Sequence, residues 1–532
     1  MAHNERGERT MRRVSLAWIG LLVPLLATPA WADEEGETLT CEEAHELDPH
    51  QLLRRLSLDL RDRIPSAEEY TALDGEETVP AETIQEFVES DDFRLAMRRY
   101  HELMFWPNVS NVRLANQNAQ LGIRNEGPAL RILSTGKGKL YRGDDGLGSC
   151  GDFEHTQFDP AFPGQFRPKP GVAEGWRMVT PYWDPATPVK VCAFDAQETA
   201  EDAGVACNTP EAASKKACGC GPDLRFCYGP SSVSSKAILD SLREQLGRAV
   251  DDVAMGAPYT DLLLSTKAWQ NGPIAFWKTH LADNLGYTVT YNKADPDEEV
   301  ADKAFTDTDW TLVDRKGLHA GVLTMPGYLL RFQTARGRAN RFRIAFTCEY
   351  FVPPAELQPA EGCSESSSDL TQRCNCQYCH SKLEPLAAFF GQFTEAGTTL
   401  MSDLSLFPRM NEDCKGKTTQ YCKRFYVTDE DAHNPGALMP YQFANVHADI
   451  EQNLEDGPRA LAQAIIDDGT LAHCTVRKLF TYLVKRDIRA QGAESEELAL
   501  LEELASGFTA SSFSLPWLVR EIVSLPQYRR VR

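Results

Sequence analysis

The segment CNCQYCHSKLEP, residues 374–385, constrains this chain most because it contains the pattern Cys-x-x-Cys-His. Covalent attachment of haem c needs two thiols that add to the two vinyl groups, and a histidine directly after them as an iron ligand. This spacing places the three side chains on one helical turn. The sequence therefore predicts one covalent haem c, held by Cys376 and Cys379, with His380 as its proximal ligand.

The competing interpretation of the same segment is a disulfide cluster. The chain has 15 cysteines, and Cys374 and Cys376 form an additional Cys-x-Cys near Cys363. Cys414 and Cys422 bracket the polar loop KGKTTQY and are expected to pair with each other. The connectivity of the other cysteines does not follow from the sequence.

A sixth iron ligand is expected downstream of the haem pattern. Met439 stands in NPGALMPYQF, where a Met-Pro pair follows a glycine, as in loops that present a thioether to iron. The apolar run over residues 386–393 is expected to form a helix that lines the porphyrin. The rival ligands are His433, His447, Met410 and His319.

The N-terminal segment predicts export. Arg12 and Arg13 precede an apolar run over residues 14–27, and Ala30-Trp-Ala32 supplies small residues for cleavage before Asp33. No later stretch reaches the roughly 18 apolar residues of a membrane-spanning helix. We therefore expect a mature protein without a transmembrane segment, located in the periplasm or at the cell surface.

The charge of the chain narrows the choice of partners. With 77 Asp and Glu against 55 Lys and Arg, the formal net charge is −22. Such acidity argues against nucleic acid or an anionic membrane surface as a partner. It favours a redox partner protein with a basic surface.

Residues 136–232 predict an irregular insert that disulfides cross-link. Gly, Pro and Asp replace helical periodicity there, and an exported chain permits disulfides. The motif CGCGPDLRFC has no histidine at metal-finger spacing, so zinc is the weaker interpretation. The six cysteines concerned are Cys150, Cys192, Cys207, Cys218, Cys220 and Cys227.

Elsewhere apolar residues recur at helical spacing, which predicts a mostly α protein with several helical subdomains. Ser66 and Glu69 form a capping box. The apolar stripes include Leu52, Leu53, Leu56 and Leu60; Phe93, Met97, Tyr100 and Met104; and Ile238, Leu242, Leu246, Val250 and Val253. The predicted division is a signal peptide (1–32), an N-terminal helical domain (33–135), the insert (136–232), a second helical domain (233–362), a cytochrome c-like haem segment (363–450) and a C-terminal helical domain (451–532).

Residues 331–343 are rich in arginine, which is unusual in so acidic a chain. The arginines are Arg331, Arg336, Arg338, Arg341 and Arg343. One interpretation is a solvated face that offsets nearby carboxylates. The other is a group of side chains that hold carboxylates of a ligand, such as haem propionates.

The order of several motifs resembles that of the planctomycete-type cytochrome c-associated proteins. The matching segments are LLRRLSLDLRDRIPSAEEY, TDLLLSTKAWQNGPIAFW, HAGVLTMPGYLLRF, CEYFVPP, CQYCHSKLEPLAAFFGQFTEAG, HCTVRKLFTYLVKRDI and IVSLPQYRR. The resemblance implies haem c and an exported location, and it supplies no substrate. The chain departs from the group at Glu384-Pro385, where Asp-Pro is usual, and in its insert and the 414–422 loop.

Three functions are compatible with these features. The first is an exported monohaem cytochrome that transfers single electrons. The second is a haem-containing oxidoreductase acting on an external substrate, for which the sequence names no catalytic residue. The third is a disulfide-cross-linked binding or structural protein without haem.

Overall fold

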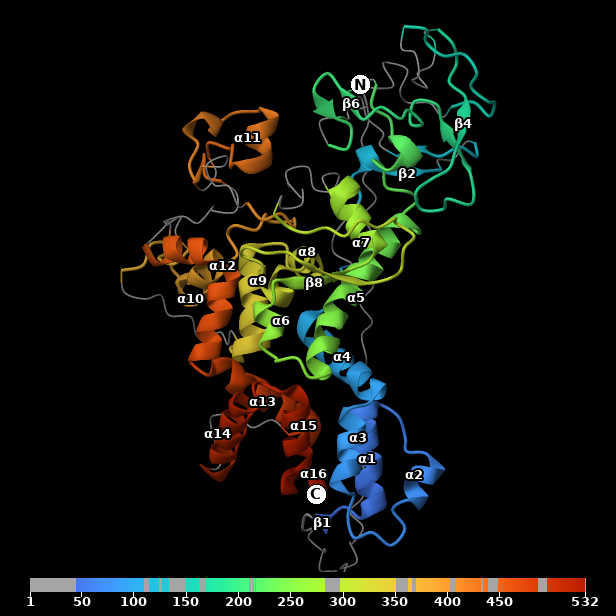
Figure 1. Cartoon of the computed structure of the whole chain (residues 1–532). Coiled ribbons are helices and arrows are strands. Elements are labelled where there is room, and N and C mark those ends of the chain that lie inside the picture. Colours follow the sequence, from blue (N-terminus) through green and yellow to red (C-terminus); the bar gives the residue numbers. More distant parts are fainter. Residues whose placement is uncertain are drawn as a thin grey trace, which may run out of the picture. The chain divides into compact units, whose positions relative to one another are not determined.

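The computed structural model describes residues 45–109, 114–123, 127–133, 150–161, 169, 171–209, 212, 215, 217–282, 297–350, 362–365, 370–401, 408–431, 434–438, 448–486 and 495–531. The chain divides into a unit of Met1–His45 with Arg532 and a compact unit of Glu46–Val531. The helices and the site below belong to the second unit (Figure 1). The predicted signal peptide and Cys41 lie outside the described residues.

The helices that open the described chain are α1 Pro49–Arg61, α2 Ala67–Thr71, α3 Ala81–Val88 and α4 Asp91–Phe105, with β1 His45–Glu46 before them. Asp48 caps α1, and Ser66 and Glu69 form the predicted capping box at α2. The predicted leucine stripe is confirmed, since Leu56 and Leu60 are fully buried. These two leucines belong to the main hydrophobic core, and α1 packs on α3 and α4.

The 3₁₀ turn η1 Gln117–Ala119 and the antiparallel pair of β2 Leu121–Gly122 with β3 Arg131–Ile132 precede the predicted insert. In its described part the insert forms two antiparallel pairs, β4 Trp176–Val179 with β5 Val189–Cys192 and β6 Glu201–Asp202 with β7 Val205–Ala206, and the 3₁₀ turn η4 Pro222–Leu224. Its six cysteines form Cys150–Cys192, Cys207–Cys218 and Cys220–Cys227. The prediction of an irregular, disulfide-cross-linked insert is therefore confirmed for its described part.

The region after the insert is centred on α5 Ser234–Ala254, whose predicted stripe is buried. The elements that follow are α6 Asp261–Leu264, β8 Lys267–Gln270, α7 Gly272–Phe276, η5 Trp277–Leu281, β9 Thr311–Asp314, η7 Gly321–Thr324, α8 Pro326–Arg331, α9 Ala335–Phe342 and η8 Arg343–Thr347. β8 and β9 pair antiparallel, with Ala268 opposite Val313. α5 packs against α4, α7 and α8, so it joins this region to the N-terminal helices.

The remaining elements carry the haem pattern and the C-terminal helices. They are α10 Gln377–Ala388, η9 Glu412–Cys414, α11 Gln420–Phe425, α12 Ala448–Asp467, α13 Thr470–Val484, α14 Ser495–Ala510, α15 Leu515–Ser524, α16 Pro526–Arg529 and β10 Arg530–Val531. Ser514 caps α15. α10 packs against α9 and α12 (Figure 1), so its partners come from two separate parts of the sequence.

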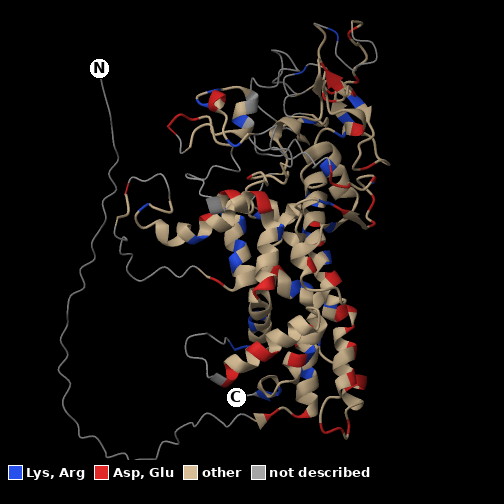
Figure 2. Ribbon diagram, turned by 60° about the vertical axis from the view of Figure 1, so that its left-hand side comes forward, with Lys and Arg blue, Asp and Glu red and all other residues tan. Residues whose placement is uncertain are grey.

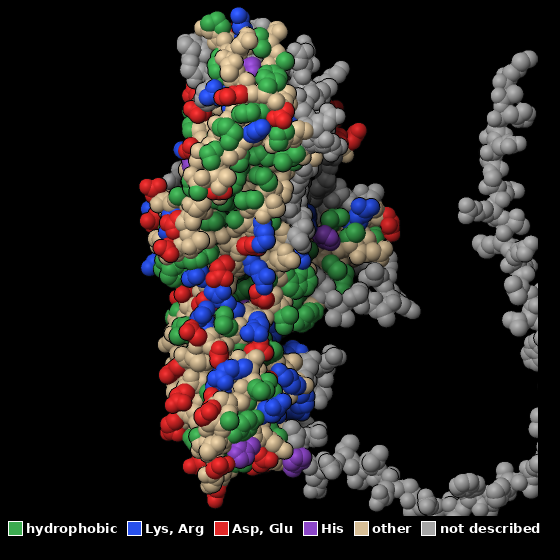
Figure 3. Space-filling model, turned by 90° about the vertical axis from the view of Figure 1, so that its right-hand side faces the viewer, with side chains coloured by type: hydrophobic (Ala, Val, Ile, Leu, Met, Phe, Trp, Pro, Cys, Tyr) green, Lys and Arg blue, Asp and Glu red, His purple; other side chains and the backbone are tan. Residues whose placement is uncertain are grey.

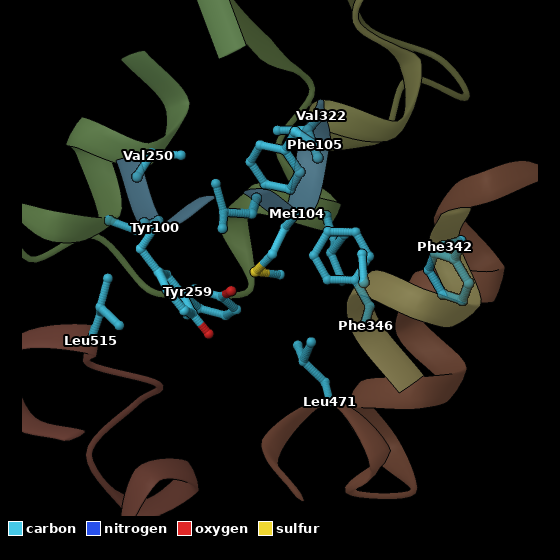
Figure 4. Packing of buried hydrophobic residues seen from close by; sticks show 14 of the residues in the cluster. Tyr100, Met104, Phe105, Val250, Tyr259, Val322, Phe342, Phe346, Leu471 and Leu515 are labelled. Atoms are coloured by element: carbon cyan, nitrogen blue, oxygen red, sulfur yellow. The ribbon is translucent and has the colours of Figure 1, made fainter. Parts of the chain in front are cut away.

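One large buried cluster unites these helices. Figure 4 shows side chains of α4, α5, η7, η8, α13 and α15 pointing into a common core around Met104 and Tyr259. Leu383 and Ala387 of α10 belong to the same cluster. The chain is mostly helical, as predicted, while the proposed domain boundaries stay a prediction.

None of the helices in the described part of the chain combines the length and the apolar character that a membrane crossing needs.

Candidate functional site

Helix α10 begins inside the Cys-x-x-Cys-His pattern. Cys376 is its N-cap, and Cys379 and His380 lie in its first turn. The backbone amides of Cys379 and His380 donate to the carbonyl oxygen of Cys376, at 3.2 and 3.0 Å. The two thiols and the imidazole therefore come from one helical turn, which is the arrangement that haem attachment needs.

The thiols of this turn differ from the other described cysteines because neither is oxidised. Cys376 and Cys379 are free and partly exposed. Cys374, two residues earlier, pairs with Cys363 and not with Cys376. The remaining disulfides are Cys150–Cys192, Cys207–Cys218, Cys220–Cys227, Cys348–Cys474 and the predicted Cys414–Cys422. The structure thus leaves the two pattern thiols available for another bond.

The imidazole of His380 is held by a carboxylate one turn further along α10. Its Nδ1 lies 2.6 Å from Oε1 of Glu384. A carboxylate oxygen accepts hydrogen bonds, so in the neutral ring Nδ1 carries the proton and Nε2 keeps its lone pair. The His380 side chain is 22% exposed, which leaves it open to a ligand from outside α10. A histidine that binds a metal through Nε2 commonly has this second partner at Nδ1.

Glu384 joins His380 to the neighbouring helix α9. Arg336 donates from Nε to the same Oε1 atom of Glu384, at 2.6 Å. Glu384 is only 4% exposed, and its Oε2 atom is buried without a hydrogen-bond partner in the structure. Sequence reasoning noted Glu384 only as a departure from the resembling group. Its spacing of four residues from His380 on a helix was the signal that could have identified the contact.

The arginine-rich stretch does not match either of its interpretations as a whole. Arg338 is fully buried, so it is not part of a solvated face. It donates to the backbone carbonyl oxygens of Leu329, Phe332, Phe393, Thr394 and Gly397. Arg341 donates to the carbonyl oxygens of Leu103 and Met104. These arginines bind protein groups: they connect α9 to the chain after α10 and to α4.

His319, a rival axial ligand, is buried in a setting that suits a metal poorly. Arg315 donates from Nη1 to Nδ1 of His319 at 3.4 Å, and guanidinium groups do not accept. The proton of the neutral ring is then on Nε2, which is buried without a partner in the structure. Burial and the charges of Arg315 and Lys278 lower the pKa of His319 well below its ordinary value. Its Nε2 therefore offers no lone pair to iron.

Of the other candidate iron ligands, the structure describes only Met410. Met410 is 43% exposed and forms a β-bridge with Ala437. Met439, His433 and His447 lie outside the described residues. The residue before Met439, Leu438, is fully buried and belongs to the same hydrophobic cluster as Leu383 of α10.

The expected helix over residues 386–393 is wrong beyond Ala388, where α10 ends and the chain turns. The apolar run is mainly part of the protein core. Ala387, Phe390 and Phe393 are fully buried among protein side chains. Leu386 and Phe389 are only partly buried and pack at the margin of the main cluster. The run therefore anchors α10, and only these two side chains remain to line a bound group.

No group of three or more His, Cys, Asp and Glu side chains within the described ranges is arranged to hold a metal ion. Comparisons of the chain with protein families, with curated proteins and with solved structures find no match.

Proposed function

We propose that this protein is an exported monohaem c-type cytochrome that transfers single electrons. Cys376 and Cys379 attach the haem, and His380 is its proximal ligand. The observation that supports this most strongly is the contrast among the cysteines: two are free, and the other described ones are all in disulfides. In a compartment that oxidises thiols, an unpaired Cys-x-x-Cys followed by His suits a different covalent partner.

The residues present fit a covalent haem. Two partly exposed thiols and an imidazole with a free Nε2 lone pair lie on the first turn of α10. When bound, haem c supplies an iron centre that takes up and releases one electron. The chain's own part is to fix the group through two thioethers, to orient His380 through Glu384, and to bury the supporting helix in the core.

We propose Met439 as the distal ligand. The described chain leads into a buried position at Leu438, next to Met439 in sequence. A thioether ligand raises the potential of a haem and fills its sixth site. In Met439→Ala we expect the loss of the sulfur-to-iron absorption band of the oxidised protein, with haem attachment unchanged. Retention of that band would exclude Met439 and direct attention to Met410, His433 and His447.

We further propose that the redox partner presents a basic surface. Figure 2 shows acidic positions distributed along the helices, and the chain carries a net charge of −22. Opposite charges accelerate encounter, and salt weakens this effect. Reduction by a basic cytochrome should therefore slow as ionic strength rises, whereas a rate independent of salt would contradict a charge-steered partner. The order of motifs supports placing the chain with the planctomycete-type cytochrome c-associated proteins.

Carbon monoxide binding to the reduced protein separates electron transfer from haem-based catalysis. If Met439 closes the sixth site, carbon monoxide should leave the reduced spectrum unchanged. Rapid binding by the wild type would instead favour an oxidoreductase with an open site. A colourless protein with Cys376 and Cys379 in disulfide-linked peptides would leave only the interpretation without haem.

A further inference from the structure

We infer that Glu384 and Arg336 form an opposed pair that sets the reduction potential of the haem through His380. This inference rests on the proposed haem attachment at Cys376, Cys379 and His380. Both residues are positioning residues: they act on the iron ligand and need not touch the haem. Glu384 increases the electron-donor strength of the imidazole, and Arg336 limits that increase.

The geometry that supports the inference is a single shared oxygen atom. Nδ1 of His380 and Nε of Arg336 both donate to Oε1 of Glu384, each at 2.6 Å. A carboxylate that accepts from Nδ1 draws its proton away and makes the ring a stronger ligand at Nε2. A stronger donor favours oxidised iron, so Glu384 lowers the potential. The guanidinium competes for the same negative charge, so Arg336 raises it.

The environment keeps this arrangement from being an incidental surface contact. Surface ion pairs contribute little because solvent screens them and their side chains move. Glu384, by contrast, is 4% exposed, and it lies on α10 where that helix packs against α9. The helix α9 that carries Arg336 is itself fixed by the buried Arg338. The guanidinium of Arg338 donates to the backbone carbonyl of Phe332, before α9, and to those of Phe393 and Thr394, after α10. Rigid elements of this kind hold a supporting hydrogen bond in one geometry.

The second oxygen of Glu384 argues for a role beyond stability. Oε2 is buried and accepts no hydrogen bond in the structure, a state that costs free energy because the oxygen has lost its hydration. A carboxylate placed only to strengthen the fold would be expected to use both oxygens. Here both donors converge on the oxygen that faces His380, which is the arrangement that tuning of the imidazole requires.

The test is the midpoint potential of three variants of the full-length, haem-loaded protein. In Glu384→Gln, a neutral amide oxygen replaces the carboxylate, and we expect the potential to rise. A tenfold change in the ratio of oxidised to reduced protein corresponds to about 59 mV, and we expect a shift of roughly this size. In Arg336→Gln, the carboxylate loses its competing cation, and we expect the potential to fall.

The double variant Glu384→Gln/Arg336→Gln provides the decisive comparison. Because Arg336 acts through the carboxylate, its substitution should have little further effect once Glu384 is replaced. The two single shifts would add if each residue merely contributed charge near the iron. Additive shifts, or single shifts in the same direction, would overturn the inference.

Glu349→Gln is the charge control. Glu349 pairs with Arg343 at 3.0 Å in a more exposed ion pair that does not involve His380, so the substitution removes the same charge without touching the iron ligand. We expect its potential to equal that of the wild type. In a Met439→Ala background, which opens the sixth site of the reduced haem, the iron–histidine stretching frequency should fall in Glu384→Gln and stay unchanged in Glu349→Gln, because only the former weakens the ligand.

The outcomes distinguish this inference from the function on which it rests. If the wild type carries no haem, the proposed function fails first. If the haem is attached and all variants share one potential, the proposed function stands and the tuning role is wrong. Should Glu384→Gln fold poorly, Arg336→Gln alone still tests the inference, since the Arg336 side chain is 33% exposed and easier to replace.

Discussion

The disulfide-rich insert and the first turn of α10 use the same residue types in opposite ways. In the insert, the six cysteines form three disulfides, and most of their side chains are fully or nearly buried. At α10, Cys376 and Cys379 are free and partly exposed, although a Cys-x-x-Cys turn can itself close a disulfide. The α10 thiols therefore remain available for another bond, whereas the insert cysteines complete a local fold.

The histidines of the two regions also differ in whether their side chains are fully used by contacts within the protein. His155 of the insert is 1% exposed, and both ring nitrogens bind backbone groups: Nε2 at 2.7 Å from the Gln157 carbonyl oxygen and Nδ1 at 3.2 Å from the Gly175 amide. His380 contacts Glu384 through Nδ1 and is more exposed. A histidine whose two nitrogens are both used supports structure, and one with a free nitrogen can bind a ligand.

The largest expected effect is the loss of haem in a cysteine variant. Cys376→Ser/Cys379→Ser should abolish covalent haem, because no thiol remains to add to a vinyl group. Cys220→Ser/Cys227→Ser, in the insert, should keep the haem in full. A haem stain after denaturing electrophoresis reads out both. Equal staining of the two variants would remove the distinction between the regions.

The next effect concerns the iron ligand. His380→Gln should lose the spectrum of a six-coordinate haem, because the amide is a poor ligand for iron. His155→Gln should retain the wild-type visible spectrum, since His155 binds only backbone groups. The visible spectra of the reduced and oxidised variants provide the measurement. A normal His380→Gln spectrum would show that another residue is the proximal ligand.

The loss of stability on removing a disulfide should depend on the length of the loop that the disulfide closes. Cys348–Cys474 closes a separation of 126 residues, and Cys220–Cys227 closes one of 7. Chain entropy then predicts losses of about 5 and about 2 kcal/mol when each pair is replaced by Ala. Urea unfolding of the two double variants measures this. A larger loss for the insert pair would show that strain or packing, and not loop closure, governs these bonds.

The smallest expected effect is a dependence of folding stability on pH. It comes from His101, which is buried without a carboxylate beside it. Burial lowers the pKa of His101 to about 4, against about 6.5 in an unfolded chain. Between pH 6.5 and pH 4 the imidazole is protonated in the unfolded state but not in the folded state. The free energy of unfolding therefore falls as the pH drops from 6.5 towards 4. The loss should reach about 2 kcal/mol at pH 5.

Urea unfolding at pH 7 and pH 5 measures this loss, and His101→Gln should reduce it. An unchanged pH dependence in His101→Gln would assign the effect to another group.

The ion pairs on the surface do not separate one region of the molecule from another in the way that the cysteines and histidines do. Figure 3 shows Lys and Arg side chains interspersed with Asp and Glu on the face that carries α4 and α5. There Arg98 pairs with Glu244 and Asp251, and Arg243 pairs with Glu102. A hollow of about 520 Å³ beside these residues is also lined by Arg99 and Asp240, which pair with Asp62 and Lys236, so its charged side chains all have partners.

Local features of the fold could be predicted from the sequence, because they depend on neighbours in the chain. The burial of Leu56 and Leu60 follows from helical periodicity, and the capping box of Ser66 and Glu69 follows from a three-residue spacing. The Cys414–Cys422 pair was also predicted, since a short loop brings the two residues together.

Features that depend on distant contacts could not be predicted. The partner of Cys348 lies 126 residues away, and no local pattern indicates it. The arginine-rich stretch was expected to meet solvent or a ligand, but Arg338 binds backbone carbonyls of segments that only the tertiary fold brings together. At the site, the Cys-x-x-Cys-His pattern is visible in the sequence, while the contact of Arg336 with Glu384 required the packing of α9 on α10.

The most direct test of the account is mass spectrometry of the peptide that contains Cys376–His380, from protein exported by a host that matures c-type cytochromes. The account predicts one haem bound covalently to this peptide and a reduced protein with a sharp α-band. A haem-free peptide in which Cys376 and Cys379 are joined to each other or to other cysteines would contradict it.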